Sequence, residues 1–85
     1  MEILEYRKND DPVKRGYFDI LIPEWQDMIL ENLCYCEKNG KSWINLPSRK
    51  KGDNWSPYFH FKDQKMTERL KQKARDKIRE YLKHQ

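Results

Sequence analysis

The chain has 85 residues, of which 36% are apolar and 38% are charged, and its formal net charge at pH 7 is +4. This length suits one small domain, and no apolar run approaches the roughly 20 residues that a membrane-spanning helix needs. We therefore expect a single domain over residues 1–85, with no membrane segment and no signal peptide. The basic balance permits a polyanionic partner but does not by itself identify one.

Strand patterns fill the first half of the chain. Residues 2–8 mix apolar residues with charges and predict a weak edge strand, and residues 9–12 predict a turn. Clear alternation over residues 13–22 predicts a strand. Its core face carries Phe18, Ile20 and Ile22. Its outward face carries Arg15, Tyr17 and Asp19.

Residues 28–37 are ambiguous, because their apolar residues also have roughly helical spacing. We interpret them as a strand, since Asn39 and Gly40 form a strong hairpin signal between this run and the strand pattern at residues 43–46. A further strand is predicted over residues 57–62. It would place Phe59 and Phe61 on one face.

From Asp63 onward the apolar period changes from two to nearly four, which predicts a helix of about 20 residues with Asp63 as its N-cap. The apolar stripe of this helix comprises Met66, Leu70, Ala74, Ile78, Tyr81 and Leu82. The predicted fold class is therefore α+β: a twisted antiparallel sheet of four to five strands, followed by one long C-terminal helix packed on one sheet face. The uncovered face would present Arg15, Tyr17, Trp43, Asn45, Tyr58, His60 and Lys62.

The stretch from Trp43 to Phe61 is the candidate functional segment. We expect a basic loop, Arg49, Lys50 and Lys51, to meet phosphates, with Lys41, Arg15 and Lys14 as outer contacts. Exposed rings could stack on unpaired bases. The ring candidates are Tyr17, Trp43, Trp55 and Tyr58, with His60 as a further one.

Structural interpretations of the same residues remain open. The rings would also suit a dimer interface or ordinary packing, and the basic triplet would also suit a solvated loop. Trp25 is expected in the core, whereas Trp55 fits either a base clamp or a core plug. The many cations of the predicted helix are interpreted mainly as a solvated face with pairs at helical spacing.

The cysteines and histidines give no catalytic or metal-site pattern. Cys34 and Cys36 would point the same way from a strand with Cα atoms about 7 Å apart, which disfavours a disulfide. Free thiols are typical of the cytoplasm. Because no other cysteine exists and His60 and His84 lie far along the chain, we expect no metal, no cofactor and no enzymatic activity.

The stretch from Ile29 to Pro57 resembles the stage V sporulation protein G (SpoVG) family of small bacterial nucleic-acid-binding proteins. The matching features are a strand, the Asn39-Gly40 hairpin, a strand that runs into Leu-Pro-Ser-Arg-Lys at residues 46–50, a turn, another strand and a terminal helix. The resemblance implies a dimeric sheet that binds DNA or RNA. It places Pro47, Ser48, Arg49 and Lys50 at the family's motif positions.

The order of strands followed by a helix is also similar to the Whirly and positive-cofactor-four group of single-stranded DNA binders, in topology alone. Small stand-alone binders of this kind are common in phages and mobile elements. The sequence thus predicts sequence-tolerant binding of single-stranded DNA, or of RNA, by a cytoplasmic homodimer. The rival prediction is a protein-interaction module or small regulator that uses the aromatic sheet face.

Overall fold

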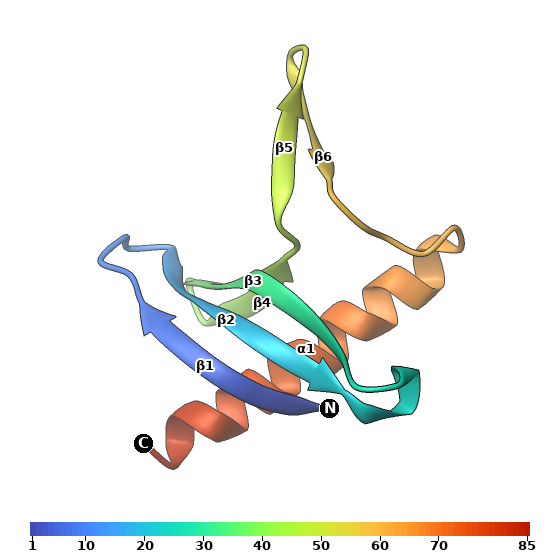
Figure 1. Ribbon diagram of the computed structural model, residues 1–85. Coiled ribbons are helices and arrows are strands. Elements are labelled where there is room, and N and C mark those ends of the chain that lie inside the picture. Colours follow the sequence, from blue (N-terminus) through green and yellow to red (C-terminus); the bar gives the residue numbers. More distant parts are fainter.

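The computed structural model describes all 85 residues, and its α+β architecture is the predicted fold class. Figure 1 shows a twisted sheet, a long helix beneath it and a hairpin that projects above it. The elements, in chain order, are β1 (Glu2–Lys8), β2 (Lys14–Ile22), the short 3-10 helix η1 (Pro23–Trp25), β3 (Met28–Lys38), β4 (Lys41–Asn45), β5 (Ser48–Lys51), β6 (Asn54–Pro57) and α1 (Gln64–Lys83).

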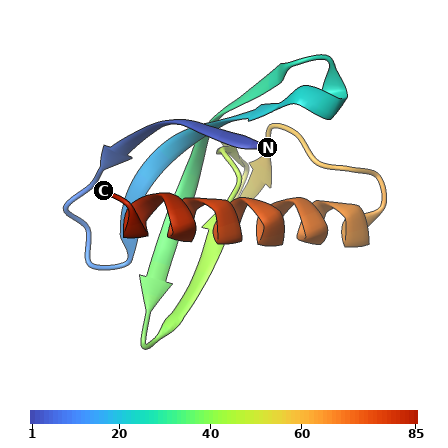
Figure 2. The ribbon, with the colours of Figure 1, turned by 90° about the horizontal axis from the view of Figure 1, so that it is seen from below.

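The main sheet has four antiparallel strands in the order β1-β2-β3-β4. α1 runs across one of its faces (Figure 2), and the core lies between the two layers. The predicted alternation of β2 is confirmed, since Phe18, Ile20 and Ile22 are buried. The complete core cluster comprises Phe18, Ile20, Ile22, Leu33, Tyr35, Ile44, Leu46, Leu70, Ala74 and Ile78.

The Asn39-Gly40 signal correctly resolved the ambiguous segment, because β3 and β4 form a hairpin around these two residues. Asn39 has φ 53° and Gly40 has φ 78°. Positive φ at both central positions is the backbone geometry that matches the twist of paired strands. It is also the geometry that asparagine and glycine adopt at least cost.

The C-terminal helix begins where the change of period predicted. The Asp63 side chain accepts a hydrogen bond of 3.0 Å from the backbone N–H of Lys65, so this residue is the N-cap. The central residues of the apolar stripe are buried, namely Leu70, Ala74 and Ile78. Met66, at the start of the stripe, is 41% exposed. α1 is not apolar enough to cross a membrane, and no other long helix exists.

The basic triplet lies on a strand, which corrects the predicted loop. Leu46 is still in the core, but Pro47 turns the chain away from the sheet, and β5 pairs only with β6 in a separate two-stranded sheet. Gly52 has φ 64° at the first position of the tight turn between them, as such two-residue turns require. We call this hairpin, residues 48–57, the arm.

The strand predicted over residues 57–62 is absent. β6 ends at Pro57, and the chain then runs without regular structure to α1. Phe59 and Phe61 still pack against the core as half-buried residues. The Phe61 backbone N–H donates to the Thr67 hydroxyl at 2.9 Å, and the Phe61 ring lies edge-on to Trp25 with ring centroids 5.4 Å apart.

Loss of this strand changes three assignments. Tyr58, His60 and Lys62 do not belong to the uncovered face of the sheet, because none of them lies in a strand. A separate correction concerns Trp25, which was expected in the core. It contacts Phe61 at the periphery and stays exposed.

Candidate nucleic-acid interface

The arm has two faces, and strand pairing sorts its side chains between them. Lys50 pairs with Trp55, and Ser48 with Pro57, so these four residues share what we call the inner face. The outer face carries the alternate pairs, Arg49 with Ser56 and Lys51 with Asn54. Trp55 is 70% exposed, and no residue of β5 is buried.

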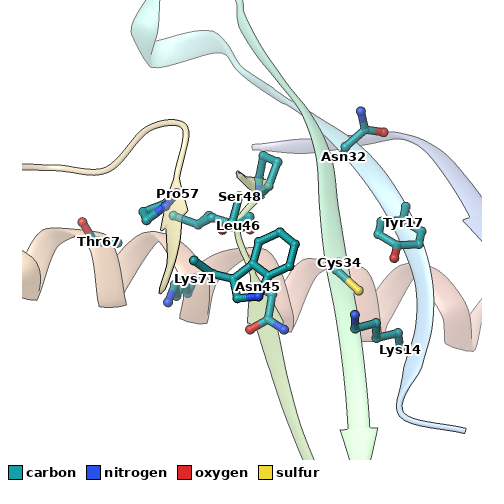
Figure 3. A pocket seen from close by; sticks show the side chains of 12 residues that line it. Lys14, Tyr17, Asn32, Cys34, Asn45, Leu46, Ser48, Pro57, Thr67 and Lys71 are labelled. Atoms are coloured by element: carbon teal, nitrogen blue, oxygen red, sulfur yellow. Dashed lines mark hydrogen bonds between the residues drawn. The ribbon is translucent and has the colours of Figure 1, made fainter. Parts of the chain in front are cut away.

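A groove of about 670 Å³ lies between the inner face of the arm and the uncovered face of the sheet (Figure 3). This volume falls within the range of roughly 300–1,000 Å³ that is typical of ligand sites. Two lysines, Lys14 and Lys71, line the groove, and no carboxylate does. The other lining residues are Tyr17, Asn32, Cys34, Asn45, Leu46, Pro47, Ser48, Trp55, Pro57 and Thr67.

A row of side chains across three strands forms the sheet side of this groove. Tyr17 pairs with Cys34, and Cys34 pairs with Asn45, so all three point to the face that α1 does not cover. The Asn45 amide donates to the Cys36 sulfur at 3.5 Å, and the Cys34 and Cys36 sulfurs lie 3.7 Å apart. The small thiols thus let Tyr17 and Asn45 border a continuous floor.

Both cysteines are free, as the sequence predicted, and both are buried. Burial and the neighbouring Cys34 raise the pKa of Cys36 to about 12. A thiol with such a pKa stays protonated at neutral pH and is a poor nucleophile. Cys36 therefore acts as a neutral packing residue beneath the groove.

A β-bulge places Lys14 at the groove, whereas the sequence placed Arg15 beside Tyr17. The register of β2 against β3 shifts between Lys14 and Gly16, and Lys14 pairs with Cys36. Arg15 instead borders a small depression on the helix side. Simple alternation cannot predict an extra residue in a strand, so the error lies in the assumption of unbroken period two.

Trp43 and Lys41 lie away from the groove. Trp43 pairs with Cys36 on the edge strand β4, where it is 37% exposed. Lys41 begins β4 beside the Asn39-Gly40 turn, while the arm follows the opposite end of that strand, about 13 Å away. Neither residue lines the groove.

The remaining predicted residues gather on the arm. The Arg49 guanidinium carbon lies 5.7 Å from the centroid of the Tyr58 ring, within the range of a cation–π contact. The Tyr58 backbone N–H donates to the Pro47 carbonyl at 3.0 Å, which extends the strand ladder and places Tyr58 at the base of the outer face. Arg49, Lys50, Lys51, Trp55 and Tyr58 therefore belong to one projecting element, although Tyr58 was predicted on the main sheet.

Sequence reasoning did not identify Asn32 and Lys71 as groove residues. Lys71 comes from α1, and only the three-dimensional path of the helix past β4 brings it there. Asn32 has φ 63° at an irregular position of β3. The one sequence signal for this irregularity was an asparagine, a residue type that tolerates positive φ, within an apolar strand pattern.

Asp19, an acidic residue of β2, is paired with a cation. Arg7 donates to both Asp19 carboxylate oxygens, at 2.9 and 3.3 Å, and the Asn32 backbone N–H donates to the same group at 2.9 Å. The Arg7 hydrogen bonds, opposed by burial and aided by the Asn32 bond, hold the pKa of Asp19 below its usual value. The carboxylate is thus ionised and paired.

No group of three or more histidine, cysteine or acidic side chains is placed to hold a metal ion. No protein-family profile matches the sequence, and neither a characterised protein nor a solved structure shows significant similarity to it. The site must therefore be interpreted from its own geometry.

Proposed function

We propose that this protein binds single-stranded nucleic acid without catalysing a reaction, with single-stranded DNA as the first ligand class and RNA as the second. One observation carries the proposal: a projecting arm with three consecutive cations borders an open groove that contains two aromatic rings, two lysines and no carboxylate. Phosphates require the cations, and unpaired bases require accessible rings.

The groove and the inner face of the arm carry this proposal. Lys14, Lys50 and Lys71 neutralise phosphates of a strand in the groove, while Tyr17 and Trp55 offer rings to its bases. Arg49 and Lys51 lie on the outer face of the arm and do not line the groove. Since these contacts use the phosphate backbone and the ring faces of bases, binding should tolerate many sequences.

A titration with oligo-dT tests this function. Tryptophan fluorescence should be quenched by the single strand, less by a duplex of equal length, and less again at higher salt. Substitution of Lys14, Lys50 and Lys71 by glutamine should abolish most of the salt-sensitive binding. Unchanged affinity in this triple variant would refute the site. Oligo-rU measured in parallel decides between DNA and RNA, which differ by the 2′-hydroxyl.

A protein-interaction role is the second candidate. An apolar pair, Leu21 and Ile29, occupies the uncovered sheet face away from the arm, and Ile29 is 52% exposed. Exposed apolar surface of this kind is typical of protein contacts. This candidate predicts no salt-dependent binding of any nucleic acid. It also predicts that neutralising the arm has no effect on partner binding.

The oligomeric state and the location also remain proposals. A homodimer is supported by the small core and by the apolar Leu21–Ile29 pair, and the SpoVG resemblance implies the same state. Sedimentation of the wild type and of Ile29→Lys would test it, since a charge there should dissociate a dimer built on this patch. Cytoplasmic location is supported by the two free thiols.

A further inference from the structure

The arm carries the same binding chemistry on both of its faces. On the inner face Lys50 lies opposite Trp55, and on the outer face Arg49 lies over the Tyr58 ring. Trp55 and Tyr58 are 70% and 64% exposed. A single strand in the groove can use only the inner set, so the proposed function leaves the outer set without a role.

The outer set is free to bind an anion. The ion pairs of the structure engage Arg7, Lys71 and Arg75, and none involves a residue of the arm. A backbone hydrogen bond to Pro47 anchors the main chain of Tyr58, and the Arg49 guanidinium lies over the Tyr58 ring. A cation that is already oriented loses less side-chain entropy when it meets a phosphate.

The arm also has the shape of a divider. It is a two-stranded ribbon that projects from the sheet side opposite α1, and no other element packs on its outer face (Figure 1). Side chains of a strand point alternately to opposite faces, so the two sets are separated by the full thickness of the ribbon. Ligands on the two faces are therefore kept apart.

We propose that the arm holds two nucleic-acid strands at once, one on each face, and that the preferred ligand is a fork where a duplex opens into two single strands. This inference rests on the proposed function and specifies its ligand. The inner face and the groove take one tail, and Arg49, Lys51 and Tyr58 take the other. The duplex then lies beyond the tip of the arm.

The tip argues against one strand that passes over both faces. Such a strand would have to turn around Gly52 and Asp53, which form the end of the arm. Asp53 is exposed and has no ion-pair partner, so its carboxylate repels a phosphate at the turning point. Two separate tails that diverge from a duplex each follow one face of the arm. Neither tail then has to turn around the tip.

Competition among matched DNA ligands tests the fork. The set comprises a two-tailed fork, the same duplex with one tail, the blunt duplex, a single strand as long as one tail, and a single strand as long as both tails together. Because two linked contacts strengthen each other, the fork should bind at least about tenfold more tightly than the one-tailed duplex. Equal affinity of the two would overturn the inference.

A double variant assigns the second tail to the outer face. R49Q/K51Q should remove the advantage of the fork and leave the affinity for the short single strand within about twofold, because that strand lies in the groove. The matched control K73Q/K77Q removes two cations from α1 and should retain the advantage. Equal weakening of both ligands by R49Q/K51Q would refute a separate outer site.

Two further results separate the inference from the proposed function. If the long single strand matches the fork and shows the same dependence on Arg49 and Lys51, one wrapped strand explains the two faces and the fork is wrong, while single-strand binding stands. If none of the ligands binds at low salt, the proposed function itself fails, and the fork fails with it.

Discussion

Lys50 and Trp55 lie directly opposite each other on the two strands of the arm, so a cation and an indole ring share one exposed face. Opposed residues of antiparallel strands have Cβ atoms about 5 Å apart. This spacing lets one nucleotide place its phosphate against the ammonium group and its base against the ring. Strand pairing thereby turns two residues that are separate in the sequence into one binding unit.

Removal of this ring should cost binding and leave the fold intact. Trp55→Ala is expected to weaken single-strand binding by about 1–3 kcal/mol, the usual value of one stacked base. Its urea-unfolding midpoint should stay close to that of the wild type, because the side chain is mostly exposed. Affinity is measured by anisotropy of a labelled oligo-dT.

Trp43→Ala is the matched control for this prediction. Trp43 lies outside the groove, opposite Cys36 on the edge strand, so its removal should change affinity much less than that of Trp55. A larger loss of affinity in Trp43→Ala than in Trp55→Ala would move the binding surface from the arm to the edge of the sheet.

Lysines on the two sides of the groove should determine its salt dependence. In K14Q/K50Q, the plot of log affinity against log salt for a single strand should become less steep by about 0.7 for each phosphate that is no longer neutralised. Isothermal titrations across a salt series measure this slope. K73Q/K77Q carries the same change in net charge on α1, outside the groove. An equal decrease of the slope in this variant would show that overall charge, and not the groove, determines the salt dependence.

The Tyr6 ring leaves no room for a side chain at Gly16. A Cβ atom added at Gly16 would overlap the Tyr6 ring, and the hydroxyl of that ring is tied to the Arg15 carbonyl at 3.1 Å. Gly16→Ala should therefore destabilise the fold by about 1–3 kcal/mol, as overpacking usually does. Urea unfolding provides the measurement.

A double-mutant cycle isolates the cause of this loss. In a Tyr6→Leu background the ring is gone, so the added methyl group should cost at least about 1 kcal/mol less than in the wild type. The same cost in both backgrounds would show that backbone conformation, and not the ring, accounts for the requirement for glycine.

Local patterns predicted the parts of the fold that local chemistry determines. The alternation at Phe18, Ile20 and Ile22, the Asn39-Gly40 turn and the Asp63 cap each depend on residues close together in the sequence. Each therefore appeared as a readable signal. The helix over Gln64–Lys83 was predictable because its period persists over about five turns.

The arm could not be predicted because its separation from the sheet is a tertiary property. Residues 48–57 have strand-like and turn-like chemistry, but nothing local shows that β5 pairs with β6 alone after Pro47. The bulge at Lys14 is similar, since a register shift depends on the partner strand. These two features decide which cations reach the groove. The sequence therefore predicted the residue types of the candidate site more accurately than their positions.

The link between Arg7 and Asp19 should make stability depend on pH in the acid range. Hydrogen bonds from Arg7, and then from the Asn32 backbone, keep the pKa of Asp19 below its usual value. The folded state therefore binds this proton less readily than the unfolded state does. The stabilisation is complete above the unfolded pKa of about 4, and it is lost as pH falls through the lower folded value.

Asp19→Asn removes the carboxylate and with it the pH-dependent stabilisation by Arg7. This variant therefore serves as the reference for the wild type. At pH 7 it should lower the free energy of unfolding by about 1–2 kcal/mol, a value reduced for the partial exposure of Arg7. The difference from the wild type should shrink steadily below about pH 4. Urea unfolding of both proteins between pH 7 and the acid limit measures it, and a difference that stays constant over that range would show that the ion pair does not contribute as proposed.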